Sequence, residues 1–474
     1  MGNTTPINFA VNSYQARSGI LSSEKLINFY PELAPERSPF QVALHGTPGL
    51  KQWKDLSQFE GIEGMIVMGE NIFVVCGNTV YKINENKSAT NLGKISTVPD
   101  RVQMTENRSQ VTILTESGRA FYATTSDVNE ITDSDYQNST SVTTLNGYSI
   151  FTKQDTDQFF ISSLLDTTAY DPLKFATAEG RSDILVNCTA HQNELWLFGE
   201  RSIEIWYNSA NPDFPFDRIN GAFIEKGCAA KDSVASDETG IYWLGDDNVI
   251  YKAQGYLPAK ISTHAIEKAI ESYAVTSDAF SFVYTQEGHK FYCLTFPTAK
   301  KTWVYSINNG LWHERESVNP NTSQIESWRP NCHVFFAGKN LIGDPRTGII
   351  YELDLDTYDE DGYLIQREAT SATQFANFSR MNLNRFTLLM DTGVGIDGNA
   401  QGFEPQMMLQ TSTDGGKTFG NEMWQPVGKI GSYDTEVYWT GLGHGRSLIV
   451  KIAISDPVKL SIVGAYLNSE IGYS

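Results

Sequence analysis

The chain has 474 residues, of which 40% are hydrophobic and 19% charged, and 56 acidic against 36 basic residues give a formal net charge of −20. This is the composition of a folded globular protein, and the length allows one large domain or two to three ordinary ones. The acidic balance, without any run of three basic residues, argues against tight binding of nucleic acid, because a phosphate-binding groove needs clustered Lys or Arg.

Membrane insertion and metal or disulfide frameworks are also disfavoured. The longest apolar run, Ile72 to Cys76, is too short to span a membrane. The cysteines stand far apart and form no C-x-x-C motif, which predicts buried free thiols in a reducing cytoplasm rather than a zinc site or disulfides. They are Cys76, Cys188, Cys228, Cys293 and Cys332.

Residues 1–60 show little periodicity and several proline breaks. Residues 61–355 repeat a unit of apolar-aromatic strand, polar or glycine turn, and second strand. The first strands of these units begin near Ile72, Val111, Tyr148, Leu195, Ile241, Phe291 and Leu341. Such a spacing leaves room for about four strands per unit, as in the blades of a β-propeller. We therefore predict a seven-bladed β-propeller over 61–355, with residues 1–60 as an extended segment that packs on the propeller or closes its ring. A large sandwich with fortuitous spacing is the alternative.

One segment, Thr263 to Ala274, is predicted to be helical. Ile266, Ala269, Ile270 and Tyr273 follow the i, i+3, i+4, i+7 pattern of an amphipathic helix. Thr263 or Ser262 could cap it. We expect this helix to pack between blades.

An acidic stretch, Asp354 to Gly362, follows the repeats. It does not fit an EF-hand, because the sixth residue from Asp354 is Asp359 rather than Gly and the twelfth is Ile365 rather than Glu. We interpret it as an interdomain turn. Residues 356–474 again read as strands and predict a C-terminal β-sandwich, so the fold class is all-β.

Two glycine motifs resemble nucleotide-binding loops without meeting their requirements. Gly393–Gly398 matches G-x-G-x-x-G, but the following residues cannot start the helix that a dinucleotide site needs. Gly415–Thr418 resembles the end of a phosphate loop, but Thr411 stands where the first glycine is required. No cofactor is predicted.

Ser412 to Phe419 fits the Asp-box hairpin, S-x-D-x-G-x-x-aromatic. Asp414 can accept hydrogen bonds from backbone amides in the turn while Phe419 packs inward. Such boxes recur in sialidases and other glycan-active propellers, but the box is a structural turn. A glycosidase also needs a positioned carboxylate pair, which this acidic sequence cannot single out.

The histidines are scattered, and neither H-x-x-x-H nor G-x-S-x-G occurs. They are His45, His191, His264, His289, His313, His333 and His444. Cys332 and His333 are adjacent in a predicted strand and would point to opposite faces, which argues against a shared metal. Trp424, Tyr438 and Trp439 favour sandwich core or subunit interface over a sugar platform. The sequence thus predicts no catalytic residues and no metal site, and it leaves the interface residues unknown.

Several longer stretches resemble the packaged-DNA stabilisation proteins of short-tailed bacteriophages, also called tail accessory, hub or nozzle proteins. The opening resemblance lies in Asn28–Glu32 and Gly46–Leu50. The central one, which is the most specific, lies in Ile205–Ser209, Phe214–Phe216, Gly221–Glu225, Gly227–Ala229, Trp243–Gly245 and Ile261–Glu267. The final one begins at Ser412 and includes Gly428–Gly431, Ser455–Val458 and Gly464–Tyr466.

This resemblance implies a virion structural protein without enzymatic activity. It implies a ring, expected to be a homohexamer, beneath the portal and its adaptor in the tail of a virion assembled in the bacterial cytoplasm. The ring would continue the DNA channel, retain the packaged genome until ejection, and bind tailspikes or fibres and a distal needle or plug. Double-stranded DNA would pass without tight binding, and no membrane partner is expected. The alternatives are a glycan-binding or glycan-hydrolysing propeller and a cytosolic propeller scaffold.

Overall fold

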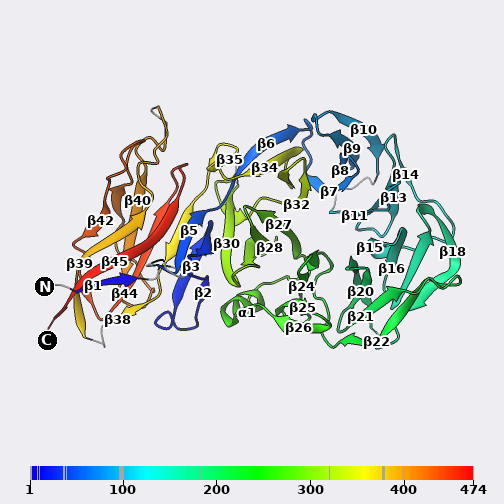
Figure 1. Ribbon diagram of the computed structural model, residues 1–474, viewed down its shortest axis with the longest axis horizontal. Helices are drawn as coiled ribbons and strands as arrows, with labels where there is room; N and C mark the ends of the chain where they lie inside the picture. Colours follow the sequence, from blue (N-terminus) through cyan, green and yellow to red (C-terminus); the bar gives the residue numbers. More distant parts are fainter. Residues whose placement is uncertain are drawn as a thin grey trace.

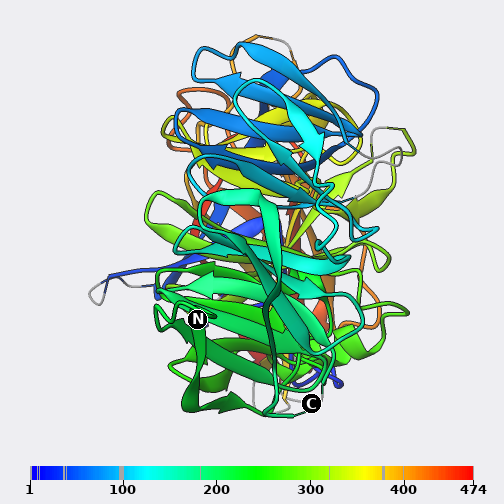
Figure 2. The same cartoon turned by 90° about the vertical axis from the view of Figure 1, so that its right-hand side faces the viewer.

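The computed structural model places a β-propeller and a β-sandwich end to end along the long axis of the molecule (Figure 1). Seen from the propeller end, the propeller stands in front of the sandwich (Figure 2). The described residues are 3–7, 9, 11–35, 38, 40–95, 101–181, 183–319, 321–375, 379–398 and 400–472.

Five sheets of the propeller are separate antiparallel sheets of four strands each. The first comprises β7 (Ile62–Met68), β8 (Asn71–Cys76), β9 (Thr79–Asn84) and β10 (Ala89–Lys94). The second comprises β11 (Gln103–Glu106), β12 (Val111–Leu114), β13 (Ala120–Ala123) and β14 (Val128–Glu130). The third comprises β15 (Ser139–Leu145), β16 (Tyr148–Lys153), β17 (Gln158–Ser163) and β18 (Asp166–Thr177). The fourth comprises β19 (Leu185–His191), β20 (Glu194–Gly199), β21 (Ile203–Asn208) and β22 (Phe216–Ile224). The fifth comprises β23 (Ala235–Asp237), β24 (Gly240–Leu244), β25 (Ile250–Gln254) and β26 (Leu257–Lys260), and the short 3-10 helix η1 (Lys231–Ser233) precedes it.

Continuous apolar strands form these sheets because both faces of each sheet are covered by its neighbours. Side chains along a strand point alternately to opposite faces. In β8, Ile72 and Val74 pack in one cluster with Leu341, which belongs to the neighbouring sheet on one side of the ring. The intervening Phe73 packs in another cluster with residues of the following sheet. Gly77 begins the turn to β9 with φ +54°, a conformation that glycine adopts without strain.

The ring closes through a sheet that joins both ends of the propeller sequence. Its strands, in spatial order, are β32 (Cys332–Phe336), β33 (Lys339–Gly343), β34 (Ile349–Asp354), β6 (Gly49–Asp55), β35 (Asp359–Glu360) and β36 (Tyr363–Leu364). β6 comes from the N-terminal segment and pairs antiparallel with β34, which places Leu50 opposite Leu353. Backbone hydrogen bonds between the two ends of the propeller therefore hold the ring shut.

A twelve-stranded sheet connects the propeller to the sandwich. It starts in the propeller with β27 (Phe280–Gln286), β28 (His289–Phe296), β29 (Lys301–Ser306) and β30 (Leu311–Val318). It continues through β3 (Ser23–Ile27), β37 (Arg367–Thr370), β44 (Ser447–Ile454), β40 (Gln406–Ser412) and β41 (Met423–Pro426). β2 (Tyr14–Gln15), β31 (Ile325–Ser327) and β38 (Gln374–Phe375) pair at its sides.

The second sheet of the sandwich has seven strands. They are β4 (Phe29–Leu33), β5 (Val42–Gly46), β45 (Ser461–Gly472), β39 (Arg380–Met390) and β42 (Val437–Thr440), with β1 (Asn3–Ile7) on β45 and β43 (His444–Gly445) on β39. Its apolar face packs on the other sheet in one core that includes Phe29, Phe386 and Trp439. The N-terminal segment, expected on the propeller, thus also supplies strands to both sandwich sheets.

The predicted blade count needs correction. All seven predicted hairpins are present as antiparallel pairs. The prediction of a seven-bladed propeller is nevertheless wrong. Within the described residues, six sheets form blades separate from the sandwich: the five four-stranded sheets and the closing sheet. β27–β30 are instead one end of the sheet that runs into the sandwich. The spacing of hairpins in the sequence indicates how many strand pairs there are. It does not indicate whether the edge strand of a sheet forms hydrogen bonds with a strand from a distant part of the chain.

The predicted helix is confirmed as α1 (His264–Glu271). The Thr263 hydroxyl caps it by accepting a hydrogen bond from the backbone N–H of Ile266. Ile266 and Ile270 are buried in a cluster with Tyr242 of β24 and Trp312 of β30. The helix therefore fills the space between two neighbouring sheets. No helix in the described part of the chain is long and apolar enough to cross a membrane.

Candidate functional site

The Asp-box forms the turn that follows β40 in the sandwich. One carboxylate oxygen of Asp414 accepts hydrogen bonds from the Ser412 hydroxyl at 2.7 Å and the Lys417 amide at 2.9 Å. The other accepts from the Thr418 hydroxyl at 2.6 Å. The hydrogen bond from the Thr418 hydroxyl contributes most to lowering the pKa of Asp414 far below its usual range. Phe419 is half-buried beneath Lys451, whose Nζ lies 4.6 Å from the ring centroid. The box acts as a turn stabiliser.

Both glycine motifs are loops. Gly393 has φ +73°, and its backbone N–H donates to the carbonyl of Val427 at 3.3 Å. No helix follows Gly398 in the described residues, so the loop presents no helix N-terminus to a phosphate. Gly415–Thr418 lie within the Asp-box turn. The Gly416 amide donates a hydrogen bond to the Ser412 hydroxyl, and the Lys417 and Thr418 amides donate to the Asp414 carboxylate.

The cysteines are free, and four of the five are buried. Burial raises the pKa of Cys293 to about 12, which keeps the thiol protonated and inert. Cys332 packs with the cluster around Ile72, whereas His333 stacks on Phe282 at 5.8 Å between ring centroids. The two neighbours therefore lie on opposite faces of β32, as expected. No group of three or more His, Cys, Asp or Glu side chains that could hold a metal occurs within the described residues.

The three aromatic residues near the end of the chain separate. Trp439 is 1% exposed in the sandwich core and donates its indole N–H to the carbonyl of Met423 at 2.9 Å. Trp424 is 54% exposed. The ring of Tyr438 lies under Arg385, with 3.8 Å between its centroid and the guanidinium carbon. They form no common platform.

Buried ionic contacts join the closing sheet to the interdomain turn. Arg329 donates to Asp344 at 2.6 and 3.0 Å and to the Tyr351 hydroxyl at 3.0 Å. Tyr351 in turn donates to Asp361 at 2.8 Å. Glu360 of the acidic stretch is 3% exposed, and burial raises its pKa to about 7. The acidic stretch is thus a structured turn, in which one carboxyl group is held inside the protein.

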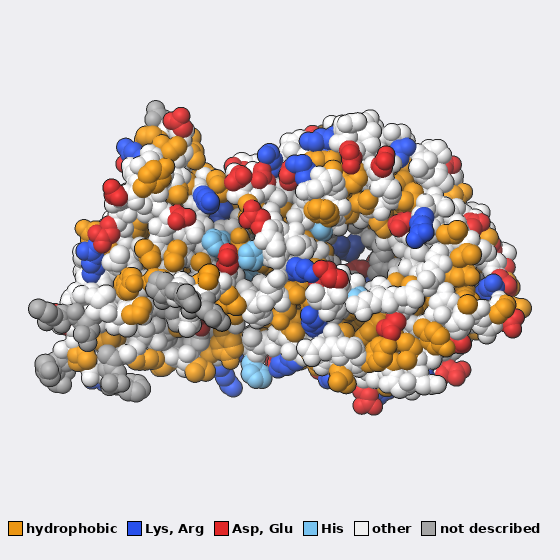
Figure 3. Space-filling view, viewed as in Figure 1, with side chains coloured by type: hydrophobic (Ala, Val, Ile, Leu, Met, Phe, Trp, Pro, Cys, Tyr) orange, Lys and Arg blue, Asp and Glu red, His pale blue; other side chains and the backbone are white. Residues whose placement is uncertain are grey.

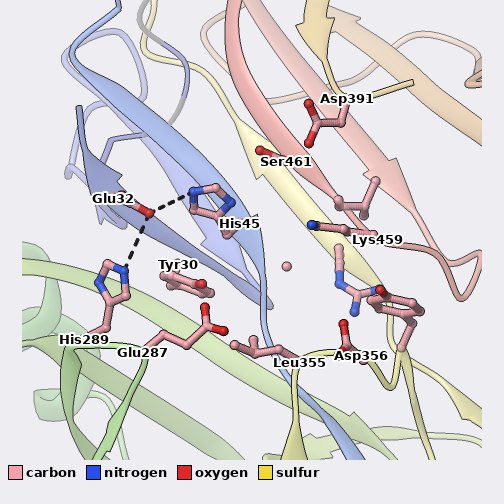
Figure 4. Close-up of a pocket in the computed structure, with 14 residues that line it drawn as sticks. Tyr30, Glu32, His45, Glu287, His289, Leu355, Asp356, Asp391, Lys459 and Ser461 are labelled. Carbon is pink, nitrogen blue, oxygen red and sulfur yellow. Dashed lines mark ion pairs between the residues drawn. The ribbon is translucent and has the colours of Figure 1, made fainter. Parts of the chain in front are cut away.

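A cavity of about 300 Å³ lies where the propeller, the N-terminal segment and the sandwich meet. In the space-filling view, histidine side chains gather in the recess between the two domains (Figure 3). Figure 4 shows the lining residues, which come from β4, β5, the β27–β28 turn, the acidic turn, β37, the end of β39 and the start of β45. They are Tyr30, Glu32, His45, Gly46, Glu287, His289, Leu355, Asp356, Tyr358, Arg367, Asp391, Lys459, Leu460 and Ser461.

One side of this junction cavity is acidic and rich in histidine. Glu32 lies between two histidines, 3.0 Å from Nε2 of His45 and 3.6 Å from Nε2 of His289 (Figure 4). Burial lowers the pKa of His45, although Glu32 opposes this shift. Burial, with Glu287 and Glu32, raises the pKa of Tyr30 to about 12. Two of the scattered histidines are therefore brought together, without a third ligand for a metal among the described residues.

The other side carries Lys459, which precedes β45 (Figure 4). Arg367 of β37 also lines the cavity. Sequence reasoning missed both residues, together with Glu32. They stand far apart in the chain and belong to no motif, so only the assembled fold reveals them.

Two protein-family models match consecutive parts of the chain. A model described as bacteriophage P22 Gp10, β-propeller, matches residues 13–358. The chain therefore belongs to the bacteriophage P22 Gp10 family. The companion model, P22 Gp10, β-sandwich, matches residues 368–470. The resemblance to packaged-DNA stabilisation proteins is confirmed, and the chain is a structural protein of a phage virion.

No curated protein matches the chain. The solved structures to which the chain is similar include the computationally designed Ika8 protein, with 11% identity and a TM-score of 0.41, covering 65% of this chain and 100% of that chain. The WD40 propeller domain of Doa1 has 9% identity and a TM-score of 0.39, covering 65% and 96%. BamB from Moraxella catarrhalis has 8% identity and a TM-score of 0.39, covering 74% and 98%. Nothing about function follows from likenesses this distant.

Proposed function

We propose that this Gp10-family protein forms a ring-shaped hub or nozzle in the phage tail, beneath the portal and its adaptor. The ring, a homohexamer, continues the DNA channel and retains the packaged genome until ejection. It also provides attachment for tailspikes or fibres and a distal needle or plug. The observation that carries this proposal is the match of both family models, in order, over 13–358 and 368–470.

The construction of the molecule supports a mechanical role. The closing sheet holds the propeller ring shut, and the twelve-stranded sheet ties it to the sandwich through continuous backbone hydrogen bonds. A unit joined in this way transmits force without a flexible linker. Chemistry has no comparable support, because the Asp-box side chains are used within their own turn. We therefore propose that the protein has no enzymatic activity.

Charge supports passage of DNA without capture. Six copies would carry about −120 of formal charge, from six times −20. Acidic or neutral channel walls do not bind the phosphates of the DNA, so the DNA can pass. The packaged genome would then be retained by a narrow channel and a seated plug.

Particles that lack the protein test the closure role. They should package DNA and then lose it, since capsid and portal remain intact while the exit is open. The measurement is the nuclease-accessible fraction of packaged DNA over time, with particles complemented by the native protein as the control. Normal genome retention without the protein would refute the closure role.

Binding of duplex DNA by the purified protein tests the acidic channel separately. Binding should be weak and depend little on salt, because few counterions are released when few phosphates are neutralised. A steep loss of affinity between about 50 and 200 mM salt would reveal many Lys or Arg contacts and contradict the proposal.

A further inference from the structure

The junction cavity contains a buried cation with unused donors. Arg367 is 1% exposed, and its Nε and Nη1 have no hydrogen-bond partner within the described residues. Only Nη2 has one, a long bond of 3.4 Å to the carbonyl of Thr47. Burial lowers the pKa of Arg367 to about 10. A buried guanidinium with free donors is costly, so a ligand that accepts those hydrogen bonds would be bound favourably.

Arg367 lines the cavity, although its side chain exposes only 1% of its surface. A Cβ atom at position 46 would lie 2.9 Å from Nε of Arg367, so Gly46 provides the room that this side chain occupies. Lys459 lines the same side and forms no ion pair with a described residue. Asp356 also lines the cavity, yet no ion pair joins it to Arg367. Neither of these basic side chains forms an ion pair with a described residue, although Glu360 interacts electrostatically with Arg367.

The lining as a whole carries an excess of acidic side chains. Apart from its histidines, the lining carries two basic side chains, Arg367 and Lys459, against four acidic ones. The carboxylates are Glu32, Glu287, Asp356 and Asp391. A simple anion would meet this excess of negative charge, whereas a ligand with an ammonium group at its other end would satisfy both sides.

We propose that the junction cavity binds a small zwitterion of the amino-carboxylate class, with its carboxylate on Arg367 and Lys459 and its ammonium group facing Glu32 and Glu287. The volume of about 300 Å³ is at the lower end of the range for small-molecule sites and suits a ligand of this size. The site lies where the propeller meets the sandwich, so an occupied site would also bridge the two domains.

Three probes of equal chain length test the ligand class: 4-aminobutyrate, butyrate and n-butylammonium. Each is titrated into the full-length protein at pH 7.5 and constant ionic strength, with binding followed by calorimetry and saturation-transfer NMR. The zwitterion should bind saturably, with a Kd at least about tenfold below those of the other two. Absence of saturable binding, or butyrate binding as tightly as 4-aminobutyrate, would overturn the proposal.

Variants locate the site. Lys459→Gln changes an exposed side chain and should weaken 4-aminobutyrate about tenfold without affecting folding. Gly46→Ala should weaken it further by displacing the Arg367 guanidinium. Lys417→Gln, in the Asp-box turn, is the matched control and should bind as the native protein does. An unchanged Kd in Lys459→Gln would overturn the assignment. These measurements use isolated protein, so their failure leaves the tail role untouched.

Discussion

The five separate sheets of the propeller and the segment 313–367 bury very different side chains. From β7 to β26, the described residues bury one Asp, Glu, Lys, Arg or His side chain, Glu204. The segment 313–367 is much shorter and buries seven. They are His313, Glu314, Arg315, Arg329, Asp344, Glu360 and Arg367.

This difference reflects two ways of specifying a fold. The separate sheets repeat one local pattern, and each stacks on its neighbours through apolar strands. The segment 313–367 must select particular partners from the N-terminal segment, namely β6, which pairs with β34 and β35, and β3, which pairs with β30. Buried polar groups penalise incorrect pairings, because a misplaced chain leaves charges without partners. We expect the two regions to respond differently to substitution.

Removing one partner of the buried ion pair should have the largest effect. Asp344→Ala leaves Arg329, which is 4% exposed at its side chain, without its carboxylate. The free energy of unfolding should fall by about 3–5 kcal/mol, measured by urea denaturation. Asp354→Ala, which breaks the exposed pair with Lys51, is the control and should cost much less. Equal losses in the two variants would show that the buried ion pair stabilises the segment no more than an exposed pair does.

Glu360 should make the stability depend on pH in an unusual direction. Its pKa is raised from 4.5 to about 7 by burial, so the unfolded chain ionises first. The stabilising contribution is complete below about pH 4.5 and is lost as pH rises through 7. Glu360→Gln stays neutral and can still accept from Ser317. Relative to the native protein, it should therefore gain about 3 kcal/mol between pH 4.5 and 7 in denaturation experiments. A constant difference across this range would show that Glu360 is ionised in the folded protein.

A conservative change in a separate sheet should cost less. Ile72→Val in β8 removes one buried methylene from an interface between two sheets, where Ile72 is fully buried. The expected loss is about 1 kcal/mol in the same urea experiment, without a change in pH dependence. A loss as large as that of Asp344→Ala would mean that the side chains around Ile72 do not move to fill the space left by the removed methylene.

The Asp-box should show the smallest global effect. Asp414→Ala removes the acceptor of the Lys417 and Thr418 amides, so hydrogen exchange at these amides should accelerate while the unfolding midpoint changes little. Turnover of a capsule or lipopolysaccharide glycan by the native chain, lost in this variant, would contradict the structural role.

The sequence by itself determined the family, the all-β class, the seven hairpins and helix α1. These features depend on local patterns, such as the continuous apolar run in β8 or the cap at Thr263, which act over a few residues. Tertiary structure alone decided that β27–β30 continue into the sandwich and which strand of the N-terminal segment, β6, pairs with β34 in the closing sheet. It also brought Glu32, His45 and Arg367 to one cavity. Pairing between distant strands depends on which edges meet in three dimensions, and a hairpin pattern contains no information about its neighbours across the sheet.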